Sequence, residues 1–526
     1  MTEDGVIGID LGTGSVKVLV ADLTGAVRAI ARRGYPTAVR PLDLAPGRGE
    51  ADPDGWLVAV AEATREAVGR SGIRPIGVGF SGQMHGLVLT AADGRAVRPA
   101  LQWTDARALP QVQLYGALSD PVLARLGGPL VPGMAGPMLA WLTRHEPDAV
   151  AAARWALQPK DWLRLRLTGQ AAGEPSDASA TLLYDLMTDA WSSDVVSALE
   201  VDPRLLPPLL THGGAPAGAL TPEAAGLLGL PAGIVVAAGA GDTAAAIHGS
   251  ALREPGEVQL TVGTGVQIVT PVERLPRPLP SRPTTHLYRT AAARGWYAMA
   301  AGLNGGSTLG WACTLLGMSL ADLNASLDSP LRQDDPVFVP HLHGERTPWL
   351  DTELRGAWTG LSARHTRVDL ARAALAGVAV TVHDAYAALL TSGALDPSNT
   401  SGSLDPSAGQ ARPVRLAGGG TADPRWRRLL ADALGRPLTA VDVADASGLG
   451  AALLAAEAAG CAIPAELPHG DTGADKGSDT GSHTGSDTGA GGGDRLIDAE
   501  PTAAGTAAFA DLVERTHARM TALRAL

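Results

Sequence analysis

A strand, a short glycine turn and a second strand follow one another at two places in the chain. The first copy is VIGIDLGTGSVKV at 6–18 and the second is EVQLTVGTGVQIV at 257–269. In the fingerprint of a dinucleotide-binding fold the glycine turn opens a helix, whereas here it leads into a strand. The likeness of DLGTGS to TVGTGV predicts two similar halves that face each other. A chain of 526 residues also exceeds what one hydrophobic core supports, so we expect at least two large domains.

The pattern of the first half predicts a mixed α/β layer. In its first strand Ile7, Ile9 and Leu11 share one face, which leaves Asp10 on the other face, at the strand end beside the glycine turn. A helix with apolar residues at helical spacing follows, and Asp54 is its expected N-cap. The expected strands lie at 6–10, 16–22, 26–33, 76–80 and 87–90.

Three further elements are expected in the second half. ARAALAGVAVTVHDAYAAL at 371–389 predicts a long helix. Residues 412–435 predict a strand, a glycine turn and a helix that starts at Asp423 and Pro424. The chain ends in a predicted amphipathic helix whose apolar side carries Phe509, Leu512, Val513, Met520 and Leu523.

Two polar segments look like insertions in this half. Residues 396–411 are rich in turn-forming residues, and residues 470–493 carry the near-repeat GSDTGSHTGSDTG. A Gly/Ser/Thr/Asp tract cannot bury enough apolar surface to offset the entropy lost on ordering, so we expect 470–493 to be disordered. We place the two domains at 1–249 and 250–526.

Charge and hydropathy limit the partners of the chain. Its formal net charge is −12, which argues against a nucleic-acid partner because phosphate neutralisation needs clustered Lys and Arg. No uninterrupted apolar run has the length of a membrane span, and the acidic start MTEDG lacks the basic residues of a signal peptide. We therefore expect a cytoplasmic protein without a membrane partner. Cys313 and Cys461 cannot make a disulfide framework or a four-thiolate metal site.

Acids and glycine turns are the candidate chemical groups. Asp242 stands among small residues in AAGAGDTAAAIHG, where a helix N-cap and a catalytic acid are both open interpretations. The turns DLGTG, TVGTG and LAGGGT can each present backbone N–H groups to a phosphate or lie close to a flat base. None of Lys17, Lys160 and Lys476 follows a glycine, so the chain has no P-loop.

Other polar residues favour structural interpretations. Lys160 and Asp161 are expected to form a structural ion pair or a cap. His341 and His343 have an HxH spacing, but no third ligand is apparent, so we expect no metal site there. His85 taken alone would be interpreted as a hydrogen-bonded structural residue.

The order and spacing of the motifs resemble the FGGY carbohydrate kinases of the actin-like ATPase superfamily. The matching stretches are IGIDLGTGSVKV, SGQMHG, ALQWTDAR, PKDWLRLRLTG, AGAGDTAAA, LTVGTG, GERTP and GAWTGLSARHTRVDLARAALAGV, which extend over nearly the whole chain. The resemblance implies an α/β fold of two actin-like ATPase (ribonuclease H-like) domains around a central cleft, with ATP and Mg²⁺ bound. Met138, Ala376 and Thr421 depart from the family pattern, which usually has Lys, an acid and Ala there.

The resemblance also assigns roles to residues on the phosphate side. Asp242 resembles the general base that accepts the proton of the sugar hydroxyl. Asp10 resembles the acid that orients Mg²⁺ through its water shell. The implied ATP-binding residues are Gly12 and Thr13 with Gly263, Thr264 and Gly265 for the phosphates, and Gly418, Gly419 and Gly420 for adenine.

On the sugar side, SGQMHG resembles the ketose pocket of family members that phosphorylate D-xylulose to D-xylulose 5-phosphate. It implies Gln83, Met84 and His85 as substrate-binding residues. Trp103 and Asp105 are further pocket candidates, with core packing and a turn cap as alternatives. A homodimer is expected by analogy only. Other sugar or polyol kinases of the family, acting on ribulose, glycerol or gluconate, and an ATP-switched binding protein are the rival functions.

Overall fold

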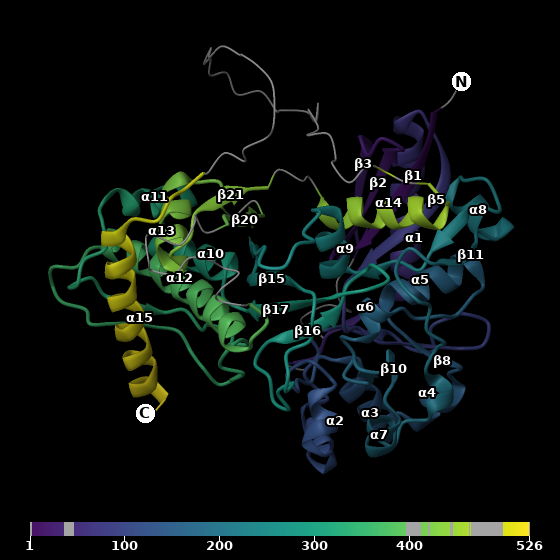
Figure 1. Ribbon diagram of the computed structural model, residues 1–526, viewed down its shortest axis with the longest axis horizontal. Helices are drawn as coiled ribbons and strands as arrows, with labels where there is room; N and C mark the ends of the chain where they lie inside the picture. Colours follow the sequence, from purple (N-terminus) through teal and green to yellow (C-terminus); the bar gives the residue numbers. More distant parts are fainter. Residues whose placement is uncertain are drawn as a thin grey trace.

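The computed structural model describes residues 3–35, 47–395, 412–418, 421–441, 445–461, 463 and 498–524. Two mixed β-sheets organise it, one at the right of Figure 1 and one near the centre. The first sheet consists of β1 (Glu3–Leu11), β2 (Ser15–Asp22), β3 (Val27–Gly34), β5 (Ile73–Gly82), β11 (Pro216–Ala219), β12 (Val235–Ala237) and β13 (Ala240–Gly241). The second consists of β14 (Gln259–Val262), β15 (Val266–Val272), β16 (His286–Arg289), β17 (Trp296–Gly302), β20 (Val414–Ala417) and β21 (Leu438–Ala440).

The two sheets share one topology. In the first, β1 pairs antiparallel with β2 and parallel with β5, while β5 pairs parallel with β12. In the second, β14 pairs antiparallel with β15 and parallel with β20, while β20 pairs parallel with β21. The two Gly-Thr-Gly turns occupy equivalent places, between the first two strands of each sheet. The predicted internal repeat and the predicted meanders are confirmed.

The two faces of β1 pack against different helices. Ile7, Ile9 and Leu11 share a core with helix α1 (Pro53–Ser71), whereas Val6 packs on the opposite face against Leu449 of helix α14 (Ala446–Ala458). This division confirms the alternation predicted for the first strand.

The start of α1 differs from the prediction. The N-cap is Asp52, whose side chain accepts a 3.1 Å hydrogen bond from the backbone N–H of Asp54. Pro53 occupies the first helical position, where a residue without an N–H and with a fixed φ fits well. Asp54 therefore lies inside the first turn, and its assignment as the cap is wrong.

The second half is built around the buried helix α12 (Arg367–Thr391). Its length and composition would suit a membrane span, but 83% of its apolar window is buried inside the protein, where α10 (Gly306–Leu316), α13 (Pro424–Leu434) and α15 (Ala503–Arg524) pack near it. The helices predicted at 371–389, after Asp423 and at the end of the chain are confirmed. The two polar segments, 396–411 and 470–493, lie outside the described residues, as do Gly419 and Gly420.

A third hydrophobic cluster lies within residues 87–205, at the lower right of Figure 1. Short elements surround it: β6 (Val88–Thr90), β8 (Trp155–Leu157), α2 (Asp120–Ala124), α3 (Ala135–His145), α4 (Pro147–Ala152) and α7 (Ser193–Ala198). The neighbouring helices α5 (Pro159–Thr168) and α6 (Pro175–Ala178) connect this cluster to the first sheet.

Helix α14 comes from the range assigned to the second domain but packs on the first sheet. In Figure 1 it lies beside β1, β2 and β5, far along the chain from those strands. Glycines make this contact close: a Cβ at Gly8 would clash with the carbonyl oxygen of Gly448, and one at Gly79 with that of Ala451. The domain division at 249/250 stays a prediction.

We predict that Gly79→Ala lowers the free energy of unfolding by about 1–3 kcal/mol, because the added methyl forces α14 away from the sheet. Gly69→Ala is the matched control, since its Cβ would meet nothing within 4 Å inside helix α1 and should raise stability slightly. Urea denaturation of both variants measures the difference. Equal stabilities would contradict the close contact.

Candidate active site

Asp10 belongs to a row of polar residues that crosses the first sheet. The register places Lys17 of β2 on one side of it and Ser81 of β5 on the other. The Ser81 hydroxyl donates a 2.8 Å hydrogen bond to Asp10 Oδ1. Burial raises the pKa of Asp10 to about 7, and the negative charge of Asp445 adds to this rise, while Ser81 and Lys17 oppose it. A bound cation would favour the ionised carboxylate.

Asp445 is the N-cap of α14 and brings a second carboxylate to this row. Its Oδ1 lies 3.2 Å from Lys17 Nζ, and its side chain is only 8% exposed. Within the described residues the buried Oδ2 has no hydrogen-bond partner. The surroundings of Asp10 therefore hold more negative than positive charge.

Asp242 begins helix α9 (Asp242–Gly249), directly after β13, which pairs with the end of β5. The N-cap of α9 is Gly241, so the interpretation of Asp242 as the cap is wrong. The backbone N–H and the hydroxyl of Thr243 donate to Asp242 Oδ1 at 2.6 and 3.2 Å. Burial nevertheless raises the pKa of Asp242. Among the described residues, no hydrogen bond reaches its Oδ2.

Two contacts near Asp242 join the halves of the protein. The Gln267 amide on β15 donates a 3.0 Å hydrogen bond to the Thr243 hydroxyl oxygen. The Tyr297 hydroxyl on β17 lies 3.8 Å from the sulfur of Met84. Gly241 leaves room for Met84, because a Cβ there would lie 2.8 Å from its Cγ. Met84 thus packs against Gly241, the residue that precedes Asp242.

Gln83 and His85 flank Met84; Gln83 is buried and His85 is half-buried. Gln83 is 2% exposed, and neither end of its amide has a hydrogen-bond partner within the described residues. His85 has a positive φ of 72°, and its Nδ1 lies 2.8 Å from the carbonyl oxygen of Ala180. Burial lowers the pKa of His85 to about 4. The neutral ring donates from Nδ1 to that carbonyl, which leaves Nε2 as an acceptor.

Trp103 and Asp105 have different surroundings. The indole N–H of Trp103 donates a 3.0 Å hydrogen bond to the hydroxyl of Thr13 in the first glycine turn. Asp105 accepts hydrogen bonds from the backbone of Gly49 at 2.8 Å and of Arg107 at 2.9 Å. Arg107 also pairs with it through its guanidinium. These are the hydrogen bonds of a turn cap, so the carboxylate of Asp105 holds its own loop in place. Trp103 instead lies next to the first glycine turn.

The two Gly-Thr-Gly turns are partly exposed and partly held by hydrogen bonds. In the first, Gly12 N–H bonds to Ser15 O at 3.0 Å, and the Tyr35 hydroxyl donates to the Gly12 carbonyl. In the second, Gly263 and Thr264 are exposed. The backbone N–H of Gly306, in the first turn of α10, donates a 2.8 Å hydrogen bond to Gly263 O. Gly265 packs directly against Gly305, where a side chain would clash.

The third glycine turn begins at Gly418, which follows β20 with a φ of 95°. A Cβ at Gly418 would lie 3.0 Å from the carbonyl oxygen of Val262, next to the second turn. The Thr421 hydroxyl donates a 2.9 Å hydrogen bond to Gly418 O. The threonine that departs from the family pattern therefore bonds to the first glycine of this segment.

The predicted Lys160–Asp161 ion pair is present inside a larger buried cluster. Lys160 Nζ lies 2.7 Å from Asp161, 3.2 Å from Glu174 and 3.2 Å from Asp177. Burial raises the pKa of Asp177, and the Lys160 ammonium opposes this rise. The cluster contacts the backbone next to Asp242: the Ser176 hydroxyl, adjacent to Asp177, accepts a 3.1 Å hydrogen bond from the backbone N–H of Gly241.

The described residues hold no group of three or more His, Cys, Asp and Glu that could ligate a metal ion directly. His341 instead lies 3.3 Å from Glu345. An ion that keeps its water shell would still fit the buried carboxylates Asp10 and Asp445.

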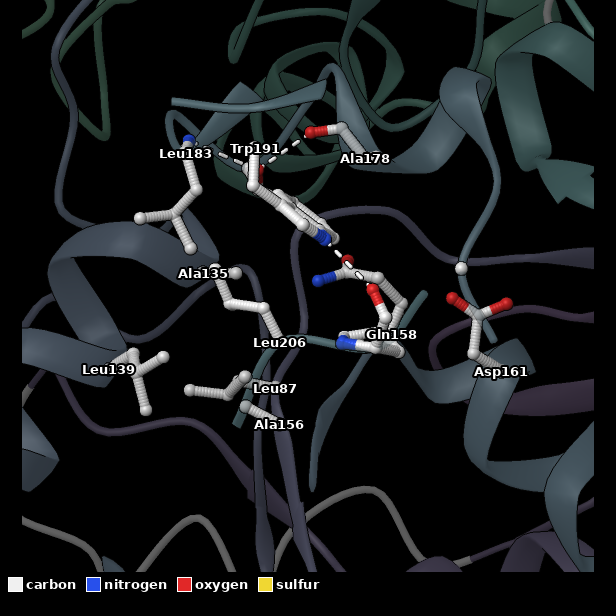
Figure 2. Close-up of a pocket in the computed structure, with 13 residues that line it drawn as sticks. Leu87, Ala135, Leu139, Ala156, Gln158, Asp161, Ala178, Leu183, Trp191 and Leu206 are labelled. Atoms are coloured by element: carbon white, nitrogen blue, oxygen red, sulfur yellow. Dashed lines mark hydrogen bonds between the residues drawn. The ribbon is translucent and has the colours of Figure 1, made fainter. Parts of the chain in front are cut away.

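The cavity of Figure 2 lies apart from Asp10 and Asp242. Its lining in Figure 2 is mainly apolar, with Gln158 and Asp161 toward one end. The Trp191 indole N–H donates to Pro207 O at 2.8 Å. A sugar would leave most hydroxyls without partners against such a lining, which argues against this cavity as a sugar site.

Sequence reasoning missed three charged groups near the site. Lys17 was weighed only as a P-loop candidate, yet counting the pairing outward from the glycine turn places it opposite Asp10. Arg346 stands in the motif GERTP, which was matched without a role for the arginine. Asp445 carries no local signal, because only the packing of α14 brings it to Asp10.

The comparisons with known proteins agree with this geometry. Residues 5–249 match the N-terminal domain of the FGGY family of carbohydrate kinases, and residues 258–459 match its C-terminal domain. The chain is 35% identical to xylulose kinase of Escherichia coli (strain K12), over 86% of this chain and 90% of that protein. It is 34% identical to xylulose kinase of Streptomyces coelicolor, over 86% and 87%.

Solved structures give the same result. The crystal structure of a xyloylose kinase from Brucella ovis superposes with a TM-score of 0.81 at 31% identity, over 99% of both chains. Xylulose kinase from Rhodospirillum rubrum gives a TM-score of 0.80 at 26% identity, over 99% of both chains. The fold is the α/β fold of two-domain actin-like ATPases. The chain belongs to the FGGY family of carbohydrate kinases, as the motifs predicted, and is a kinase.

We predict that Asp10→Asn stabilises the ligand-free protein at pH 8. The pKa of Asp10 rises from 3.8 to about 7 on folding, so the folded state binds more protons between these values and wild-type stability falls as pH rises. Asn cannot ionise, so the variant does not lose this stability, and its free energy of unfolding should exceed that of the wild type by at most about 4 kcal/mol.

Urea denaturation from pH 4 to pH 8 measures the effect. The stability difference between variant and wild type should grow up to pH 7 and then level off. Asp148→Asn, at an exposed position, is the control. A difference that stays constant with pH would contradict the raised pKa.

Proposed function

We propose that the protein transfers the γ-phosphoryl group of ATP to D-xylulose and produces D-xylulose 5-phosphate, with Asp242 as the general base. The observation that carries this proposal is the environment of Asp242. Its Oδ1 is held by Thr243, its Oδ2 has no hydrogen-bond partner among the described residues, and Met84 packs against Gly241, the residue before it. A fixed carboxylate with one oxygen free, and with its pKa raised by burial, suits proton abstraction from a hydroxyl.

In the proposed reaction the sugar hydroxyl oxygen attacks the γ-phosphorus and forms the new P–O bond. The bond between this phosphorus and the bridging oxygen of ADP breaks, and the hydroxyl proton passes to Asp242 Oδ2. The two Gly-Thr-Gly turns would hold the phosphates from opposite halves, at Gly12 and Thr13 and at Gly263, Thr264 and Gly265. The N–H groups of Gly12 and Gly263 already donate within their turns, to Ser15 O and Gly265 O, so the N–H groups of Thr13, Thr264 and Gly265 would contact the phosphates. Gly418 would lie against the adenine.

Mg²⁺ would be held through its water shell by Asp10, with Asp445 as the nearest further carboxylate. The buried Oδ2 of Asp445 lacks a partner within the described residues, and both acids lie beside a single ammonium group, Lys17. When bound, the ion would neutralise charge on the phosphates.

The choice of D-xylulose rests on Gln83, Met84 and His85 and on the xylulose kinases among the relatives. The unpaired amide of Gln83 and the acceptor Nε2 of His85 are available to sugar hydroxyls. The experiment below therefore includes other sugars, because the residues of the pocket, and not the fold, determine which substrate a kinase accepts.

We predict that D-xylulose gives the highest Mg·ATP-dependent release of ADP in a panel with D-ribulose, L-ribulose, glycerol, gluconate and xylitol. Asp242→Asn should lower kcat about 10²- to 10⁴-fold, because the amide cannot accept the proton. Asp93→Asn, at an exposed turn of the same half, should retain full activity. ATP turnover that is independent of sugar and unchanged by Asp242→Asn would contradict the kinase mechanism.

A further inference from the structure

The backbone around Arg346 is firmly held within the second half. Glu345 is 2% exposed and accepts the backbone N–H of Leu303 at 2.7 Å and that of Arg346 itself at 2.9 Å. The Asn304 amide donates to the same carboxylate at 2.9 Å. On the other side, the Thr347 hydroxyl donates to a backbone carbonyl at 2.7 Å. These hydrogen bonds fix the position of the Arg346 backbone, from which its side chain extends.

The Arg346 guanidinium contrasts with its satisfied neighbours. In the part of the chain that the structure describes, it takes part in no hydrogen bond or ion pair, and its recorded contact is with the ring of Trp103, 5.1 Å from Cζ. Trp103 belongs to the first half and donates its indole N–H to Thr13. A partly buried guanidinium with five free donors needs acceptors.

The electrostatic neighbours of Arg346 place it at the sugar end of the site. Its positive charge contributes to the lowered pKa values of His85 and His286. It is not among the main causes that act on the pKa of Asp10 or Asp242. The guanidinium therefore lies within electrostatic reach of His85, His286 and Tyr288 and of the neighbouring Glu345 carboxylate. Asp10 and Asp242, the carboxylates proposed to act on phosphate and proton, are not among the groups that act on the pKa of Arg346.

We propose that Arg346 is a specificity-determining residue that donates hydrogen bonds to the carbonyl end of an acyclic ketose. The proposal rests on the proposed function. A ketone oxygen accepts only and matches the donor-only guanidinium, while the adjoining hydroxyl can donate to the acceptor Nε2 of His85. Arg346 and His85 together would recognise the neighbouring carbonyl and hydroxyl of a ketose, and Asp242 would take the proton at its other end.

The test is calorimetric titration of D-xylulose and of xylitol, without ATP, into the wild type and three variants. Arg346→Met should weaken D-xylulose binding about 10- to 100-fold, since a hydrogen bond from a charged donor is lost. Binding of xylitol, which has no carbonyl, should weaken less. Arg346→Lys should recover part of the affinity, because it keeps the charge without the planar fork. The KM for ATP should change less than about twofold.

Arg355→Met is the matched control. Arg355 is exposed in the following segment and donates only to backbone carbonyls of Thr352 and Leu354, so its loss should leave both titrations unchanged. Thermal denaturation of each variant verifies folding, and Arg346→Lys tests the role if Arg346→Met is unstable.

Three results would overturn the role of Arg346. One is equal D-xylulose affinity in the wild type and Arg346→Met, with kinase activity intact, which would leave the proposed function standing. The second is a loss confined to the KM for ATP, which would assign Arg346 to the nucleotide. The third is tighter wild-type binding of D-gluconate than of D-xylulose, which would assign the guanidinium to a carboxylate. A wild type that neither binds nor phosphorylates D-xylulose would instead overturn the proposed function, and the inference with it.

Discussion

The close contact between α14 and the first sheet sets the charges around Asp10. Glycines on both surfaces let the backbones approach, so that the start of the helix brings Asp445 to the row of Lys17, Asp10 and Ser81. Because α14 follows the strands of the second half in sequence, the same contact also ties the two halves together. The arrangement of the acids thus depends on positions that carry no functional group, and one methyl group at the contact would disturb it.

The charged groups divide the site into two ends. Asp10 and Asp445 lie beside the ammonium group of Lys17, and the charge of Asp242 also acts on Asp10, so this end suits a divalent cation and its phosphates. At the other end His85 is neutral at physiological pH and Arg346 provides the positive charge. Burial causes this division more than pairing does, because desolvation is the largest cause of the pKa shifts of Asp10, Asp242 and His85. A neutral sugar and a metal-bound nucleotide would therefore bind at different ends of the site.

Local patterns were sufficient to predict the strands, the two glycine turns and the position of Asp10, because a side-chain period of two and a glycine turn are fixed by neighbours in sequence. The same was true of the helix that starts after Asp423. The cap of α1 was misplaced by two residues, since Asp52 and Asp54 are equally good caps and only Pro53 between them decides. The contacts of Arg346 with Trp103 and of Asp445 with Lys17 join residues hundreds of positions apart, and no local period encodes them.

Contacts between the halves touch the neighbours of the proposed catalytic groups. Gln267 of the second half donates to Thr243, which in turn donates to Asp242, and Arg346 of the second half lies over Trp103, which donates to Thr13 of the first glycine turn. Separation of the halves would break the Gln267–Thr243 and Arg346–Trp103 contacts, while the backbone N–H of Thr243 would still donate to Asp242. In the mechanism we propose, the Thr243 hydroxyl beside the base would therefore be fixed only while the halves are together, and their contact would limit transfer of the phosphoryl group to water.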